Sequence, residues 1–184
     1  MRRLLLPGVA VLAAVALLAL LAYGVSNQGT NSSIDSQVAH GHYPQAPDAH
    51  LALPVLGGSG RETLAAFRGR VVVLNIFASW CQPCAAEAPI LEHLQGYLAQ
   101  HGATVLGITY LDTSTDSEQF ARQWHLSYPI LRDVNGTLVR SLGTSGVPET
   151  FVIDRQGRIA ALRRFPLDAT WIERALPPVL AQRS

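Results

Sequence analysis

Both cysteines of this 184-residue chain lie in one Cys-x-x-Cys segment, Cys81-Gln82-Pro83-Cys84. The preceding apolar run at 71–77, whose only polar residue is Asn75, predicts a strand buried on both faces of a sheet. Apolar residues at helical spacing follow over residues 82–100. The chain therefore places its two thiols at the step from a buried strand to a helix, and this position limits both the fold and the chemistry.

The position of the two thiols favours redox chemistry. Free N–H groups and the helix dipole at a helix N-terminus stabilise a thiolate, here that of Cys81. Cys84 is expected on the same face one turn deeper, close enough to close a disulfide. We expect Cys81 to attack a substrate disulfide and Cys84 to resolve the mixed disulfide. A structural disulfide would stabilise little across so short a loop, and a metal site would need further ligands.

The rest of the pattern predicts an α/β fold with a mixed β-sheet and helices on both faces. Pro54 indicates that the first strand lies at an edge. Residues 154–157, Asp-Arg-Gln-Gly, predict the turn of a hairpin. Besides 71–77, strands are expected at 51–56, 104–111, 128–131, 150–153 and 158–162; besides 82–100, helices are expected at 115–124, 137–142 and 168–181.

The N-terminus has the pattern of a membrane segment. Arg2 and Arg3 precede 19 residues, 4–22, that carry no polar side chain. As a helix such a run spans about 28 Å, close to the ~30 Å hydrocarbon core of a bilayer. The two arginines predict a cytoplasmic N-terminus, so we expect a transmembrane anchor over 1–23 in the cytoplasmic membrane and an extracytoplasmic catalytic domain. Cleavage of a signal peptide after Gly24 is the alternative, and it would deliver the domain to the same side.

Composition sets the remaining boundaries. Residues 24–50, rich in Ser, Asn, Gln and Gly, predict a flexible linker with a reach of about 30 Å, and residues 51–184 predict the folded domain. The 14 basic residues nearly balance the 13 acidic ones, for a net charge of +1. A nearly neutral chain has no strong positive potential to attract phosphate backbones, so nucleic acid is not an expected partner.

Four segments resemble one known family. Residues 72–84, Val-Val-Leu-Asn-Ile-Phe-Ala-Ser-Trp-Cys-Gln-Pro-Cys, resemble the active-site strand and turn of the thioredoxin fold. More narrowly, they resemble the membrane-anchored extracytoplasmic thiol-disulfide reductases of the CcmG/DsbE, ResA and TlpA family. Residues 84–89 match C-x-x-E-x-P, residues 107–112 match G-x-x-Y-x-D, and residues 146–154 match G-x-P-E-T-F-x-I-D. The resemblance covers nearly all of the region from 45 to 184 and implies a thioredoxin-like fold there.

The resemblance also implies a substrate-binding surface. A cis peptide between Val147 and Pro148 is expected opposite the cysteines, where its extended backbone can pair with a substrate like an added strand. Glu149 follows this peptide and Trp80 precedes the nucleophile, so both are expected to contact the substrate.

One departure from thioredoxin bears on proton transfer. Thioredoxin has a buried aspartate where this chain has Asn75, which cannot carry a proton. Glu87 is therefore the candidate general base for Cys84. Carboxylates such as Glu87 and Glu149 raise the pKa of a nearby thiol, and this favours a reductant over a strong oxidant.

The resemblance implies an extracytoplasmic reductase without a cofactor or metal, working as a monomer. It would take electrons from a membrane dithiol donor and keep the C-x-x-C-H thiols of apocytochrome c reduced for haem attachment. Two alternatives stay open: a general thiol oxidase or isomerase, and a Cu(I)-binding metallochaperone that uses the same two thiols. Reduction potential separates the first alternative from the reductase, and stoichiometric Cu(I) binding would favour the second.

Overall fold

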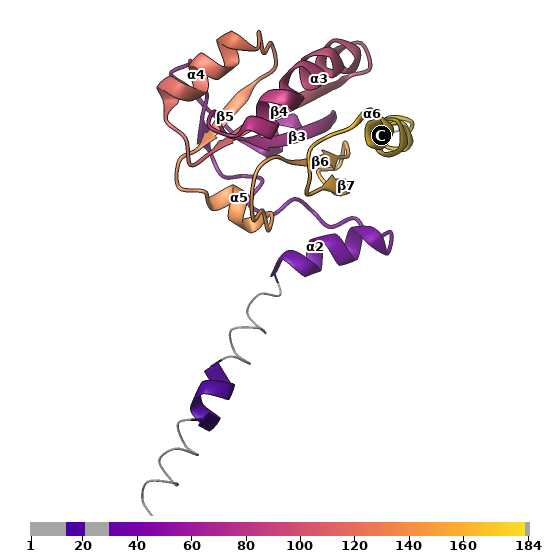
Figure 1. Ribbon diagram of the computed structural model, residues 1–184. Coiled ribbons are helices and arrows are strands. Elements are labelled where there is room, and N and C mark those ends of the chain that lie inside the picture. Colours follow the sequence, from indigo (N-terminus) through magenta and orange to yellow (C-terminus); the bar gives the residue numbers. More distant parts are fainter. Residues whose placement is uncertain (1–13, 21–29, 183–184) are drawn as a thin grey trace, which may run out of the picture.

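The computed structural model describes residues 14–20 and 30–182, drawn in colour in Figure 1. Residues 14–20 are helical and are followed, after a gap, by the folded domain. The elements in chain order are α2 (Thr30–Ala39), β1 (Leu53–Pro54), β2 (Arg61–Glu62), the 3-10 helix η1 (Leu64–Phe67), β3 (Val71–Phe77), α3 (Gln82–Ala99), β4 (Ala103–Tyr110), α4 (Ser114–Gln123), β5 (Ile130–Asp133), α5 (Thr137–Ser141), β6 (Glu149–Ile153), β7 (Ile159–Arg163) and α6 (Ala169–Leu180).

Five strands form one mixed sheet in the order β5-β4-β3-β6-β7. Strands β3, β4 and β5 are parallel, whereas β6 runs antiparallel to β3 and β7 antiparallel to β6. All seven residues of β3 are buried, because it is the central strand and both of its faces are covered. Gly157, at a φ of 81°, lies in the turn that joins β6 to β7. The mixed sheet and the terminal hairpin confirm the predicted fold class.

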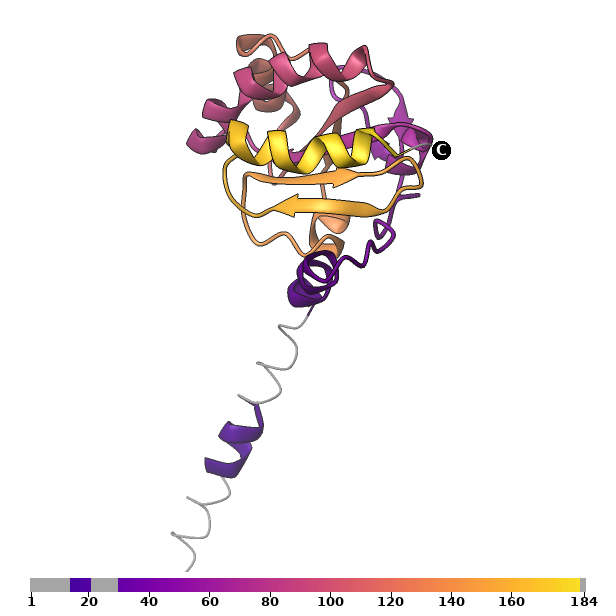
Figure 2. The ribbon, with the colours of Figure 1, turned by 90° about the vertical axis from the view of Figure 1, so that its right-hand side faces the viewer.

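The two faces of the sheet have separate cores. Alternate residues of β3 point to opposite faces, so Val73 joins one core and Leu74 the other. Helices α3, α4 and α6 cover the face of Val73, and α5 and η1 cover the face of Leu74. Figures 1 and 2 show α3 and α6 on one side of the sheet and α5 on the other.

The region before β3 differs from the prediction in the length of its strand and in its order. The first predicted strand, 51–56, is shortened to β1, which is an edge strand as expected and pairs with β2 in a separate two-stranded sheet; Val55 bridges to Leu131 of β5. The predicted flexible linker contains α2, and its last residues are packed, with Ala46 and Ala49 buried. A polar composition predicted a tether here, but a few apolar residues per turn suffice to dock such a segment on an existing core.

The predicted membrane anchor lies mostly outside the described residues. Of residues 1–23 the structure describes only 14–20, which are helical and exposed. Within the described parts of the chain, no helix has both the length and the apolar character needed to cross a membrane.

Candidate active site

Cys81 and Cys84 form a disulfide at the start of α3. Cys81 is the N-cap residue, and its Sγ accepts a hydrogen bond from the backbone N–H of Cys84 at 3.1 Å. Pro83 lies in the first turn, where the missing N–H leaves no bond unmade. Both cysteines are nearly buried, with 4% and 3% of their surface exposed. These positions agree with the sequence-based expectation, in which Cys81 lies at the N-terminus of the helix and Cys84 lies inside its first turn.

Asp112 holds the turn that leads into the cysteines. Its carboxylate accepts hydrogen bonds from the backbone N–H and the hydroxyl of Ser79, each at 2.8 Å, and from the Ser117 hydroxyl at 2.8 Å. Trp80 is 62% exposed, and its Nε1 donates to the Leu111 carbonyl oxygen at 3.2 Å. An exposed indole therefore stands beside the disulfide on a turn that is fixed from the β4–α4 loop. In the sequence Asp112 is recognisable only as the last residue of the 107–112 motif, and no local signal indicates that it holds this turn.

The peptide bond between Val147 and Pro148 is cis, as the sequence predicts. Val147 packs against both core clusters, one of which contains the two cysteines, and the register of β6 on β3 places the cis peptide at the end of β3 from which the cysteine segment leaves. Glu149, the next residue, begins β6 and pairs in register with Ile76 of β3. The two segments that sequence reasoning joined are therefore neighbours in the fold.

Glu87 lies inside the domain, one turn beyond Cys84 on the buried face of α3. Its carboxylate accepts hydrogen bonds from the backbone N–H of Leu167 and from Asn75 Nδ2, the latter at 3.3 Å. Burial raises the pKa of Glu87 above its ordinary value of 4.5, although these two hydrogen bonds and the charge of Arg163 act in the opposite direction. A buried carboxyl that tends to hold a proton near a resolving cysteine can accept and release that proton during exchange.

Asn75 joins Glu87 to the cis-proline segment. Its Nδ2 group also donates to the Thr150 hydroxyl at 3.0 Å, so one amide links α3 with β6 across the central strand. Burying an amide is tolerated when its hydrogen bonds are made, as they are here. Where thioredoxin has a buried aspartate, this chain has Asn75, whose amide links α3 and β6 by hydrogen bonds.

Glu149 is 2% exposed and forms an ion pair with Arg164, which follows β7. Burial lowers the pKa of the Arg164 guanidinium, but its hydrogen bonds to Asp35 and Glu149 and their charges outweigh that effect and raise it. This ion pair compensates the charge of Glu149, whereas the sequence-based expectation treats that charge as acting on the nearby thiols. Glu87, in contrast, has no salt bridge within the described residues and stays the candidate base for Cys84. Nothing in the sequence indicated Arg164.

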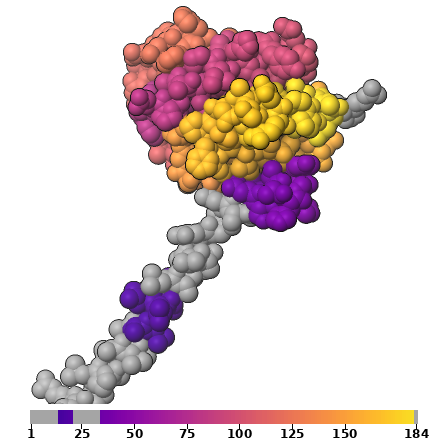
Figure 3. Space-filling model, turned by 45° about the vertical axis from the view of Figure 1, so that its right-hand side comes forward, coloured from indigo at the N-terminus to yellow at the C-terminus, as the bar shows by residue number. Residues whose placement is uncertain are grey.

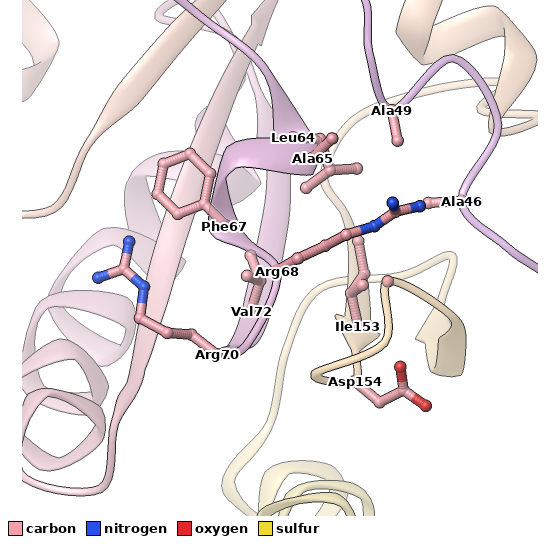
Figure 4. Close-up of a pocket in the computed structure, with 11 residues that line it drawn as sticks. Ala46, Ala49, Leu64, Ala65, Phe67, Arg68, Arg70, Val72, Ile153 and Asp154 are labelled. Atoms are coloured by element: carbon pink, nitrogen blue, oxygen red, sulfur yellow. The ribbon is translucent and has the colours of Figure 1, made fainter. Parts of the chain in front are cut away.

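Other parts of the domain lie apart from this chemistry. The pocket in Figure 4 is lined by η1, the start of β3 and the end of β6, with Leu64, Val72 and Ile153 in its wall. The cysteines follow the opposite end of β3, so this pocket is not part of the candidate site. Across residues 14–20 and 30–182, no three His, Cys, Asp or Glu side chains gather into a group that could hold a metal ion.

Comparison with known proteins finds matches over most of the domain. The AhpC/TSA family profile matches residues 44–162. The thiol:disulfide interchange protein HelX of Rhodobacter capsulatus is 34% identical over 133 residues, 71% of this chain and 73% of that protein. The thiol:disulfide interchange protein DsbE of Pseudomonas fluorescens biotype C is 36% identical over 108 residues, so the match spans only 58% of its length and 58% of this chain.

The solved structures agree with this picture. The crystal structure of a putative thiol:disulfide interchange protein DsbE from Chlorobium tepidum superposes with a TM-score of 0.68 at 28% sequence identity. The match covers 75% of this chain and 96% of that one. The similarity therefore extends over almost the whole of that neighbour.

Proposed function

This chain belongs to the AhpC/TSA family, among the thioredoxin-like thiol-disulfide oxidoreductases of the DsbE, ResA and HelX kind, and on that premise we propose that it is a thiol-disulfide reductase. The observation that carries the proposal is the Cys81–Cys84 disulfide at the N-terminus of α3, bordered by a cis-proline segment. A helix N-terminus stabilises the thiolate that must attack, and the extended segment before Pro148 can pair with a bound polypeptide.

The reaction needs only the two thiols. The Cys81 thiolate attacks one sulfur of a client disulfide, so a mixed disulfide forms and one client thiolate leaves. Glu87 takes the proton of the Cys84 thiol, and the Cys84 thiolate then attacks the Cys81 sulfur and releases the second client thiolate. The client gains two electrons, and the enzyme is left with the Cys81–Cys84 disulfide. A membrane dithiol donor returns it to the reduced form by the same exchange in reverse.

The client we propose is the C-x-x-C-H segment of an apocytochrome c, which must be in the dithiol form before haem attachment. Support comes from the family, whose members include the thiol:disulfide interchange proteins DsbE and HelX. We also propose that residues 1–23 anchor the chain in the cytoplasmic membrane and hold the domain on the extracytoplasmic side. An oxidising compartment is where a dedicated reductase with its own electron supply is required.

Reduction potential tests the direction of the reaction. The chain is equilibrated with thiol buffers of known potential, and the fraction of Cys81–Cys84 disulfide is measured by alkylation. A potential at or below about −230 mV supports a reductase, whereas a value near −120 mV would indicate an oxidant and contradict the proposal. Failure to form a reversible disulfide, together with stoichiometric Cu(I) binding, would favour a metallochaperone.

A trapping experiment tests the roles of the two cysteines. Cys84→Ala should accumulate a mixed disulfide between Cys81 and the client peptide, because the resolving thiol is absent. Cys81→Ala is the matched control and should trap little, because Cys84 lies inside the first turn of α3 and lacks the N-cap position that stabilises the thiolate of Cys81. Better trapping by Cys81→Ala would contradict the assignment.

A further inference from the structure

Arg164 joins segments that are far apart in the sequence. Its Nη1 group pairs with Glu149, and its Nη2 group donates to Asp35 Oδ1 of α2 at 2.7 Å. The same Nη2 group donates to the Leu142 carbonyl oxygen at the end of α5, at 3.1 Å. The guanidinium also lies over the ring of Phe151, 5.0 Å from its centroid. With 16% of the side chain exposed, it is one of the most fully bonded cations among the described residues.

The partner Glu149 in turn holds the loop that carries the cis peptide. Its Oε1 atom accepts a hydrogen bond from the backbone N–H of Ser145 at 3.2 Å. This bond closes residues 145–149 into a short turn around the Val147–Pro148 peptide. One carboxylate, that of Glu149, therefore contacts both the loop before Pro148 and the Arg164 guanidinium.

Helix α2 is seated on the domain rather than projecting from it. Ile34 is buried and Val38 packs on the same core cluster, which also contains Phe151. Figure 3 shows α2 against the surface formed by the C-terminal hairpin. Asp35 lies between these two apolar anchors in the sequence, and its carboxylate, 41% exposed, reaches Arg164. Docking of α2 thus completes the set of acceptors around the guanidinium.

We propose that Arg164 is a positioning residue for the substrate-binding loop 143–148, and that α2, through Asp35, belongs to the catalytic domain instead of serving only as a tether. The inference rests on the proposed function, since the loop acts only where a polypeptide disulfide is bound. Without Asp35, the Arg164 guanidinium loses the carboxylate that its Nε and Nη2 groups share and is held only by Glu149 and the Leu142 carbonyl oxygen. The Glu149 carboxylate then loses its fixed position, and the loop with it.

The test compares two substrates of the full-length chain in detergent micelles. One is a disulfide peptide containing Cys-x-x-Cys-His, and the other is 2-hydroxyethyl disulfide, which has no peptide backbone to pair with the loop. Asp35→Asn and Arg164→Gln should lower the ratio of peptide rate to small-disulfide rate by about tenfold or more, because misplacement of a binding element costs up to about a hundredfold in rate. The potential of Cys81–Cys84 should stay at the wild-type value.

Matched controls lie on exposed surfaces. Gln37→Ala changes the exposed side of α2, and Arg122→Gln changes an exposed arginine of α4. Both should keep the wild-type ratio. Asp35→Asn removes a partly exposed carboxylate without a change of shape, so it carries the test even where Arg164→Gln does not fold.

Each outcome decides the inference. The inference is overturned if Asp35→Asn and Arg164→Gln, both folded at 25 °C, keep the wild-type ratio of peptide rate to small-disulfide rate and only unfold at a lower temperature. Such a result would show that the two residues have a merely structural role. If the wild-type chain itself does not reduce the peptide, the proposed function fails and the inference falls with it. A lowered ratio in both variants, with the controls unchanged, supports it.

Discussion

The buried carboxyl of Glu87 makes the stability of this domain depend on pH in a defined direction. Burial raises its pKa above 4.5 in the folded protein, so the folded chain binds this proton at a pH where the unfolded chain has released it. The free energy of unfolding therefore falls as the pH rises from about 4.5 through the raised pKa. We predict that Glu87→Gln, which cannot ionise, gains stability relative to wild type over that interval.

The hydrogen bonds of Glu87 determine how much stability the Glu87→Ala variant should lose. Gln retains an oxygen to accept from the Leu167 N–H, whereas Glu87→Ala leaves that N–H without its partner. An unmade buried hydrogen bond costs about 1–3 kcal/mol, and Asn75 loses less because it keeps Thr150 as an acceptor. At about 2–4 °C per kcal/mol for a domain of this size, Glu87→Ala should unfold roughly 2–12 °C below wild type at pH 4.

Thermal unfolding of the oxidised chain, followed by circular dichroism from pH 4 to pH 8, measures both effects. The midpoint of Glu87→Gln minus that of wild type should increase with pH. A difference that stays flat, or one that shifts in favour of wild type as the pH rises, would refute the reasoning that burial dominates at Glu87. In the same variant, release of the client from the mixed disulfide should slow by about a hundredfold if the carboxyl is the base for Cys84.

Four further substitutions give clear expectations. Gly107→Ala should destabilise the domain by about 1–3 kcal/mol in urea unfolding, because a Cβ there would lie 3.0 Å from the Phe77 ring; Gly96→Ala in α3, with open space around it, should instead stabilise by up to about 1 kcal/mol. Asp112→Ala removes the acceptor of the Ser79 N–H and should cost about 1–3 kcal/mol, read from the same unfolding curves. Trp80→Ala, at a 62% exposed site, should change stability by less than about 0.5 kcal/mol yet raise the KM for a peptide disulfide; an unchanged KM would exclude Trp80 from substrate binding.

Much of the fold could be predicted because its signals are local. The apolar run of β3, the helical spacing of α3 and the turn at Gly157 each lie within a few residues, and all three are in the structure. The cis peptide before Pro148 was also predicted, through a motif of adjacent residues. The first strand was predicted with the correct edge character but too long, because an apolar run does not show which of its residues find a partner strand; in the structure only Leu53 and Pro54 pair with β2.

By itself, the sequence determined the chemistry available to this protein: two thiols at a helix start, an acid one turn later and a proline motif downstream. The tertiary structure alone decided which polar and charged groups meet. Asp35 and Arg164 are 129 residues apart, and Asn75 and Thr150 are 75 apart, yet each pair is in hydrogen-bond contact. Periodicity reports which face of one element is buried, but a contact between distant segments depends on strand order and helix docking. That is why the pairing of Glu149 and the seating of α2 appear only in three dimensions.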